Sequence, residues 1–171
     1  PLGYTIEDRH LREVLYNHVS KSTKVKIISE TVTKCVTKNS LSHIYLENGD
    51  LIKSKVTLAC DGKNSKIASK SGISATRKDH AQHAIVTSVE HEYDHNGTAY
   101  QFFMPAGPLA ILPLRRNRSS IVWVLPNALA LTTFSLKRAA FTEALKPAFG
   151  DFLGKIKIIG KRFSYPLNSI I

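Results

Sequence analysis

Four strand-like runs follow one another with short connections in the second half of the chain, and this succession restricts the fold more than any other feature. The runs are HAIVTSVEHEY (83–93), AYQFFMP (99–105), LAILPLR (109–115) and SSIVWVL (119–125). Parallel strands need long crossover connections, whereas antiparallel neighbours can be joined by a few residues. The second half of the chain therefore predicts an antiparallel sheet.

A helix and a final strand region follow these runs. The segment SLKRAAFTEALKPAF (135–149) has helical spacing of its apolar residues, with Ser135 as N-cap and Pro147 placed to end or kink the helix. The stretch KIKIIGKRFSYPL, which begins at Lys155, predicts one or two more strands.

The first half combines one helix with short strands. Residues 5–20 predict a helix with Thr5 as N-cap and an apolar stripe at helical spacing. Strand-like runs follow at 25–29 and 31–37, and Asn48-Gly49 between apolar runs predicts a hairpin. A further strand is expected at Lys55–Cys60. Together the two halves predict an α+β fold.

The length of 171 residues with 43% hydrophobic content suffices for one ordinary core, or for one domain and part of another. The chain contains no apolar run of the roughly 18 residues that a membrane span requires. Met104 is the single methionine, so Pro1 is not a translation start. We therefore expect a piece of a larger protein.

The charge balance is basic, with 24 Lys and Arg against 13 Asp and Glu and a net charge of +11. Only Arg115-Arg116-Arg118 and Arg77-Lys78 form compact groups, and no basic run is interleaved with aromatic residues. The pattern disfavours nucleic acid as a partner. Weak attraction to anionic lipid headgroups fits it better, at about 1 kcal/mol per basic residue near such a surface.

Metal and disulfide chemistry find little support in the sequence. The two cysteines, Cys35 and Cys60, lack zinc-ligand spacing and lie in strand-like runs, where a thiol acts as a small hydrophobe. Two histidine pairs occur, His80 with His83 and His91 with His95. Because a zinc site needs further ligands, we interpret these histidines as scattered surface residues and predict no metal site.

The stretch LACDGKNSKIASKSGI (58–73) carries the first candidate site. At the end of a strand, the Asp61 carboxylate is placed to accept hydrogen bonds from ribose hydroxyls or backbone N–H groups. Gly62 permits close approach of another backbone or a phosphate, and Ser65 is suited to cap the following helix. An ordinary turn explains the same residues, because Asp-Gly is a common turn pair.

A second candidate lies in the proline-rich strands of residues 99–123. Pro105, Pro108 and Pro113 interrupt ladder hydrogen bonds, so these strands must break, bulge or lie at an edge. Gly107-Pro108 forms a rigid corner between two apolar runs. Such a bent apolar wall suits a flat apolar ligand, although an irregular crossover in the sheet explains it equally well.

Three segments together resemble a known family, the FAD-dependent aromatic-ring hydroxylases of ubiquinone biosynthesis, which are relatives of para-hydroxybenzoate hydroxylase. GYTIEDRHLREVL (Gly3–Leu15) is similar to the start of the family's helix, ACDGKNSKI (Ala59–Ile67) to its Asp-Gly motif, and AYQFFMPAGPLAILPL (Ala99–Leu114) to its proline-rich strand segment. SSIVW (119–123) and YPL (165–167) fit the continuation. The resemblance covers essentially the whole chain.

The resemblance implies two domain parts along the chain. Residues 1–75 correspond to part of a split FAD-binding domain, and residues 76–171 to a substrate-binding sheet with its helix. Residues implied to contact FAD are Arg9, Asp61, Gly62 and Ser65. Residues implied to face the flavin and substrate are Gln101, Phe103, Pro105, Gly107, Pro108, Leu112 and Pro113. The reaction implied is NAD(P)H-dependent hydroxylation of an electron-rich ring, with no catalytic side chain assigned.

The chain also departs from the family pattern. The family's Gly-x-Gly-x-x-Gly turn and its later Gly-Asp segment are absent from the sequence, Ala68 stands where arginine is common, and Asp8 where asparagine is common. We therefore expect a central fragment that by itself neither retains FAD nor turns over.

The resemblance further implies a prenylated phenol or quinol as substrate. With it come a cytoplasmic location at the periphery of the inner membrane, and other ubiquinone-biosynthesis proteins as partners. Ile170 and Ile171 at the end of the sequence predict some self-association. A non-catalytic lipid- or quinone-binding module that lacks flavin is the alternative.

Overall fold

The computed structural model describes residues 3–170, which divide into two compact units. The first unit consists of Asp79–Ser169 together with the N-terminal residues up to His10. The second consists of Leu11–Lys78 together with the end of the chain from Ile170.

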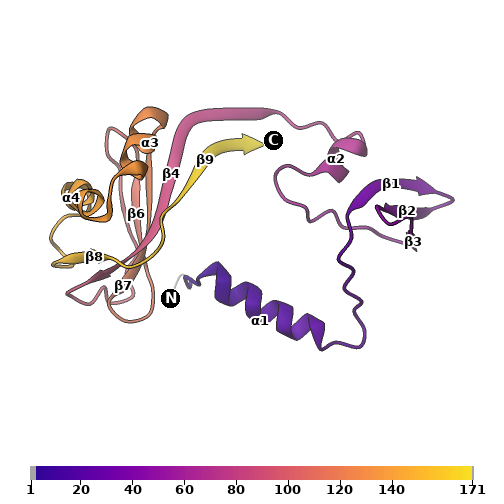
Figure 1. Ribbon diagram of the computed structural model, residues 1–171, viewed down its shortest axis with the longest axis horizontal. Coiled ribbons are helices and arrows are strands. Elements are labelled where there is room, and N and C mark those ends of the chain that lie inside the picture. The colour runs from indigo at the N-terminus through magenta and orange to yellow at the C-terminus, as the bar shows by residue number, and fades with distance from the viewer. Residues whose placement is uncertain (1–2, 171) are drawn as a thin grey trace. The chain divides into compact units, whose positions relative to one another are not determined.

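The first unit is built on a six-stranded sheet in the order β5-β6-β7-β4-β8, with β9 also paired to β4 (Figure 1). The β5–β6, β6–β7, β7–β4 and β4–β8 pairs are all antiparallel, which confirms the sequence prediction. The bounds are β4 Arg77–His91, β5 Tyr100–Phe102, β6 Leu109–Pro113, β7 Arg118–Pro126, β8 Ile156–Ile158 and β9 Phe163–Ile170.

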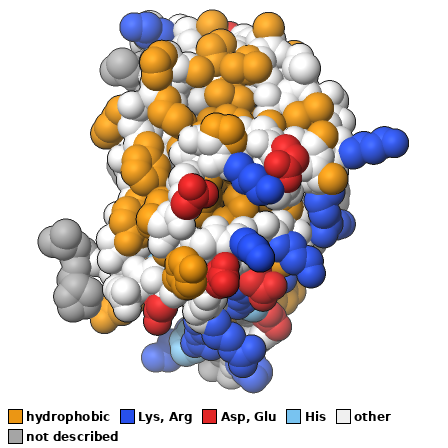
Figure 2. All heavy atoms as spheres, turned by 90° about the vertical axis from the view of Figure 1, so that its left-hand side faces the viewer, with side chains coloured by type: hydrophobic (Ala, Val, Ile, Leu, Met, Phe, Trp, Pro, Cys, Tyr) orange, Lys and Arg blue, Asp and Glu red, His pale blue; other side chains and the backbone are white. Residues whose placement is uncertain are grey.

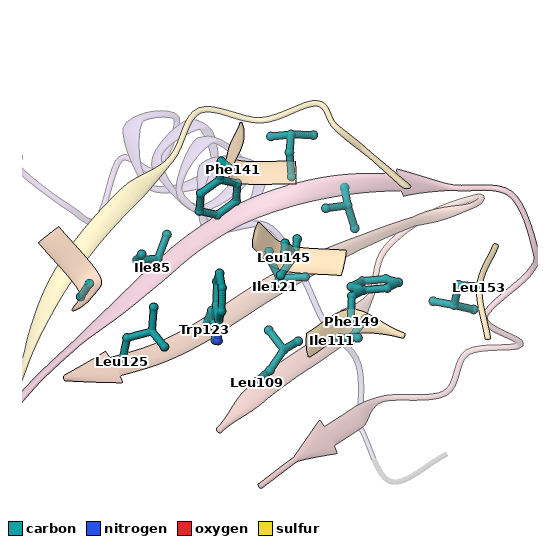
Figure 3. Packing of buried hydrophobic residues seen from close by; sticks show 13 residues of the cluster. Ile85, Leu109, Ile111, Ile121, Trp123, Leu125, Phe141, Leu145, Phe149 and Leu153 are labelled. Atoms are coloured by element: carbon teal, nitrogen blue, oxygen red, sulfur yellow. The ribbon is translucent and has the colours of Figure 1, made fainter. Parts of the chain in front are cut away.

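Two helices, α3 (Asn127–Ser135) and α4 (Arg138–Phe149), pack against one face of this sheet and close its core. The Phe141 ring of α4 meets the Trp123 indole of β7 edge-on, with ring centroids 6.2 Å apart. Ile85, Ile121 and Leu145 lie in the same fully buried cluster (Figure 3). The side of the first unit on which α3 and α4 lie carries apolar, basic and acidic side chains (Figure 2).

The opposite face of the sheet is formed by small and aliphatic side chains that are half-buried or exposed. Strand alternation and register place on it Val86, Ser88, Gln101, Ala110, Leu112, Ser120 and Val122. None of these residues belongs to the buried cluster beneath the helices. We call these seven residues the helix-free face, since neither α3 nor α4 packs on it.

The second unit contains a three-stranded antiparallel sheet in the order β1-β2-β3. Its elements are β1 Val32–Lys38, β2 Leu41–Leu46, β3 Leu51–Ser54 and the short helix α2 Lys66–Lys70. The predicted hairpin at Asn48-Gly49 is confirmed, with Gly49 at φ +90° and the Leu46 amide donating to the Asp50 carbonyl at 2.9 Å. Helix α1 (Asp8–Ser20) begins three residues later than expected, so Thr5 is not its N-cap.

Two strands predicted in the first half are absent, because 25–29 and 55–60 form no ladder with the residues that the structure describes. Apolar β-branched residues take strand conformation only where a neighbouring strand supplies hydrogen bonds. Here Val56 and Leu58 are 72% and 80% exposed. Cys60 likewise lies in an exposed loop, whereas Cys35 is half-buried in β1.

The helical region after β7 also differs from expectation. Helix α3 was not predicted, and Ser135 is its last residue rather than the cap of α4, whose N-cap position is held by Lys137. Pro147 lies inside α4 without ending it at the preceding residue. A proline so near the C-terminus removes a single helical hydrogen bond. The helix ends two residues later at Phe149, and Gly150, with φ +77°, is its C-cap.

The interpretation of the histidines as surface residues was wrong for the second pair, since His91 and His95 are 4% and 8% exposed. The His91 ring is held between the Tyr93 carbonyl oxygen at 2.7 Å and the Ser119 hydroxyl at 3.0 Å. The His95 ring pairs with the Leu114 carbonyl oxygen and the Gly97 amide. Because β4 ends at His91, His95 lies in the following loop rather than on the same strand.

Within residues 3–170, none of the helices combines the length and the apolar character that a membrane span requires. Ile170 is half-buried at the end of β9, and Ile171 lies outside the described residues, so self-association stays a prediction.

Candidate cofactor and substrate site

The Asp61 turn holds its carboxylate at the start of helix α2. Asp61 Oδ2 accepts hydrogen bonds from the backbone amides of Lys66 at 3.0 Å and Ile67 at 3.4 Å. The hydrogen bond from the Ser65 side chain, followed by these amide bonds, lowers the pKa of Asp61 below its ordinary value of 3.8. The exposed carboxylate is therefore ionised at neutral pH and fixed in direction by the backbone.

Gly62 and Ser65 shape the same turn. Gly62 has φ +83°, a conformation that residues with a side chain rarely adopt. Ser65 is the N-cap of α2, and its hydroxyl oxygen accepts from the Ala68 amide at 3.0 Å. The segment therefore forms a turn, as Asp-Gly pairs commonly do. A role of Asp61, Gly62 and Ser65 in binding a cofactor stays a prediction.

The Gly107-Pro108 corner forms as expected between β5 and β6. The Gly107 amide donates to the Met104 carbonyl at 3.0 Å, and Gly107 has φ +137°. A Cβ atom at Gly107 would lie 2.4 Å from the Val124 carbonyl oxygen. The corner lies so close to β7 that only glycine fits.

The structure separates the seven residues implied to face the substrate. Gln101 and Leu112 lie on the helix-free face, whereas Pro113 pairs with Ser119 on the face toward the helices. Phe103 is 82% exposed in the loop after β5, and Pro105, Gly107 and Pro108 build the corner. Two of the seven thus belong to one surface, four lie in the loop between β5 and β6, and Pro113 lies on the opposite face of the sheet.

A pocket of about 460 Å³ lies at the β4 side of the helix-free face. Its walls include Val86 and Ser88 from β4, Arg9 from the first turn of α1 and Phe163 from β9. Three cationic side chains, Arg9, Arg118 and Lys161, line the pocket with one carboxylate, Glu7, which accepts from Arg9 at 3.1 Å. The pocket is consequently cationic.

The sequence reasoning missed most residues of this pocket, and Arg9 is its one predicted member. The two-residue alternation of the run VTSVE would have placed Val86 and Ser88 on one face of β4. No local signal connects Phe163 or Arg118 to it, because these residues come together only through the pairing of β9 and β7 with β4.

Each unit offers its own candidate surface for a ligand. The helix-free face is built from small and aliphatic side chains such as Ala110, Ser120 and Val122, which leave a smooth surface for a ring. The ionised Asp61 carboxylate is suited to accept hydrogen bonds from hydroxyl groups. Among the described residues, no cluster of three or more His, Cys, Asp or Glu side chains is arranged to hold a metal ion.

Comparison with curated proteins identifies relatives of the chain. No family model matches the chain. It is 33% identical, over 98% of its length, to the ubiquinone hydroxylase UbiL of Rhodospirillum rubrum. The chain is a homologue of the ubiquinone hydroxylases. It is also 27% identical over 99% of its length to UbiM of Neisseria meningitidis, and 31% identical over 71% to the 3-demethoxyubiquinol 3-hydroxylase of Escherichia coli.

This hydroxylase homologue spans only part of its relatives. It covers 39% of the length of UbiL and 37% of that of UbiM. The resemblance that the three sequence segments indicated is confirmed, and so is its restriction to a part of the family's length.

Solved structures agree on the fold. The flavin-dependent halogenase CmlS matches 96% of the chain with a TM-score of 0.69 at 16% identity, and the chain covers 32% of CmlS. The flavin-dependent monooxygenase PieE, solved with FAD and substrate, matches 97% with a TM-score of 0.69 at 14% identity, and the chain covers 31% of PieE. These likenesses confirm the predicted α+β class.

Proposed function

We propose that this chain is the central part of an FAD-dependent monooxygenase that hydroxylates the aromatic ring of a prenylated phenol or quinol in ubiquinone biosynthesis. The observation that carries the proposal is the similarity to a ubiquinone hydroxylase over 98% of the chain. The ionised Asp61 turn and the helix-free face support it, because they offer a hydroxyl acceptor and a smooth surface for a ring.

Each of these candidate surfaces has its own role in this proposal. Asp61, Gly62 and Ser65 hold the nucleotide end of FAD, and Arg9 binds a negatively charged part of the cofactors. When bound, FAD supplies the activation of molecular oxygen that no protein side chain provides. The helix-free face, through Gln101 and Leu112, orients the substrate ring and excludes water from it. NAD(P)H is the proposed reductant.

The proposed substrate also determines where the protein works. A prenyl tail is apolar and stays in the bilayer, so the ring must be reached from the membrane surface. The net charge of +11 favours contact with anionic lipid headgroups. We therefore propose a cytoplasmic protein at the periphery of the inner membrane, working beside other proteins of the same biosynthesis.

The test is oxygen consumption by the full-length protein loaded with FAD. We expect NAD(P)H-dependent oxygen uptake that increases with a prenylated phenol, and a product heavier by one oxygen atom. Replacing Leu112 by Trp obstructs the helix-free face and should lower kcat/KM about a hundredfold, the cost of a small misplacement of the ring. Leu131→Trp, on an exposed position of α3, should leave kcat/KM unchanged.

Absence of substrate-dependent oxygen uptake across a series of prenylated phenols would overturn the proposal. If Leu112→Trp and Leu131→Trp lowered kcat/KM equally, the helix-free face would not be the substrate-binding surface.

A further inference from the structure

A second cavity, of about 380 Å³, lies on the helix side of the first unit. It is lined by Phe134, Arg138, Phe141, Ile158, Gly160, Lys161 and Arg162. Three of these side chains are cationic and none is acidic. Cationic side chains gathered without a carboxylate repel one another, and an anion among them relieves that repulsion.

Arg162 is held at this cavity by the fold itself. Its Nη2 donates to the Leu136 carbonyl oxygen at 2.5 Å, and the guanidinium carbon lies 4.6 Å from the centre of the Phe141 ring. Its Nη1 is buried and has no hydrogen-bond partner among the described residues. A buried charged donor without a partner is unfavourable, so this atom would be stabilised by a hydrogen-bond acceptor.

Arg138 brings a second guanidinium to the same place. It is the first residue of α4, and its Nη1 donates to the Ile158 carbonyl oxygen at 3.2 Å, which fixes the side chain beside the cavity. The N-cap residue Lys137 makes no side-chain cap hydrogen bond, so the positive end of the helix dipole adds to the two arginines.

From these observations we propose that the cavity binds a phosphate-type oxyanion. Arginine forks are matched to tetrahedral and planar oxyanions, and the unpaired Arg162 Nη1 supplies a donor already oriented by its neighbours. The apolar walls at Phe134, Phe141 and Ile158 admit the ester portion of a substituted phosphate. Inorganic phosphate and the headgroup of an anionic phospholipid share this chemistry.

The cavity shares Gly160 and Lys161 with the cationic pocket beside the helix-free face, but Arg138 and Arg162 line only the cavity on the helix side. Phe141 and Ile158 belong to the core beneath the helices, whereas ring binding is assigned to the helix-free face. Oxygen uptake and anion binding therefore report on the two proposals separately.

The test is a calorimetric titration of the full-length protein with inorganic phosphate, with sodium chloride adjusted to keep the ionic strength constant. We expect saturable binding, weakened about tenfold or more in Arg138→Gln, because a hydrogen bond to a charged group is lost. Lys137→Gln removes the same charge from the neighbouring position outside the cavity and should change affinity less than about twofold. Arg162→Lys keeps the charge but loses the fork, and should also weaken binding.

Co-sedimentation with vesicles separates the two sources of the anion. Binding to phosphatidylcholine vesicles that contain phosphatidylglycerol, lost in Arg138→Gln but retained in Lys137→Gln, assigns the site to a lipid headgroup. Saturable phosphate binding without this vesicle dependence assigns it to a free phosphate compound. No binding to either, or equal losses in the two glutamine variants while Trp123 fluorescence shows both folded, overturns the proposal.

Discussion

Among single residues, Gly107 illustrates a position that no side chain can occupy. The backbone there adopts φ +137°, and the Val124 carbonyl oxygen lies where a Cβ atom would be. We predict that Gly107→Ala lowers the free energy of unfolding by about 3 kcal/mol, from strain combined with the contact. Gly97→Ala, at φ +67° with no heavy atom within 4 Å of the added Cβ, should cost only about 1 kcal/mol.

Urea unfolding followed by Trp123 fluorescence measures both variants, since Trp123 lies in the core of the first unit. Equal losses for the two glycines would show that Val124 moves aside and that backbone strain alone matters.

Asp61 provides a prediction that depends on pH. Its folded-state pKa is depressed, so its contribution to stability is present above about 3.8 and is lost as the pH falls through the lower folded-state value. Ser65→Ala removes the largest cause of the shift and should raise the Asp61 pKa toward 3.8. Carboxyl carbon NMR titration measures it. Ser69→Ala, a neighbouring position on α2, should leave the titration of Asp61 unchanged. If Ser69→Ala raised the Asp61 pKa as much as Ser65→Ala does, the Ser65 hydrogen bond would not be the cause of the shift.

At the scale of elements, the pairing of β4 with β7 depends on a polar contact inside an apolar core. Since the Tyr93 carbonyl oxygen can only accept, His91 Nδ1 carries the proton, and in the neutral ring Nε2 accepts from the Ser119 hydroxyl. Ser119→Ala leaves this buried nitrogen unpaired and should lower the free energy of unfolding by about 1–3 kcal/mol.

Ser120→Ala is the matched control, because Ser120 is the next residue of β7 and lies half-buried on the helix-free face. We expect a change within about 0.5 kcal/mol for it. If urea unfolding gave comparable losses of unfolding free energy for both serine variants, the substitutions would act by disturbing strand β7 and not by removing the contact with His91.

At the scale of the whole molecule, the two units differ in how much core they possess. Every buried hydrophobic residue of the described chain except Leu46 belongs to the first unit. We predict that amide hydrogens of β1, β2 and β3 exchange with solvent before those of β4, β6 and β7, because little apolar burial opposes opening of the small sheet. Hydrogen exchange followed by NMR or mass spectrometry on this chain tests it, and simultaneous exchange of both sheets would show that the units open together.

The site was only partly accessible from sequence. The Asp61 turn and the Gly107 corner could be predicted, because glycine, proline and a capping serine that are adjacent in sequence favour turns by themselves. The pocket that includes Val86 and Phe163 does not, because these residues are 77 positions apart and meet only through strand pairing.

The sequence by itself determined the local elements that carry their own signals and the family to which the chain is related. Strand alternation, the Asn48-Gly49 hairpin and most of the helix predicted over 135–149 are short-range effects of side-chain periodicity and turn chemistry. Tertiary structure decided which strand-like runs become strands, since Val56 and Leu58 have the right side chains but no pairing partner. It also decided the burial of His91 and His95, because burial depends on what packs over a residue and not on its own chemistry.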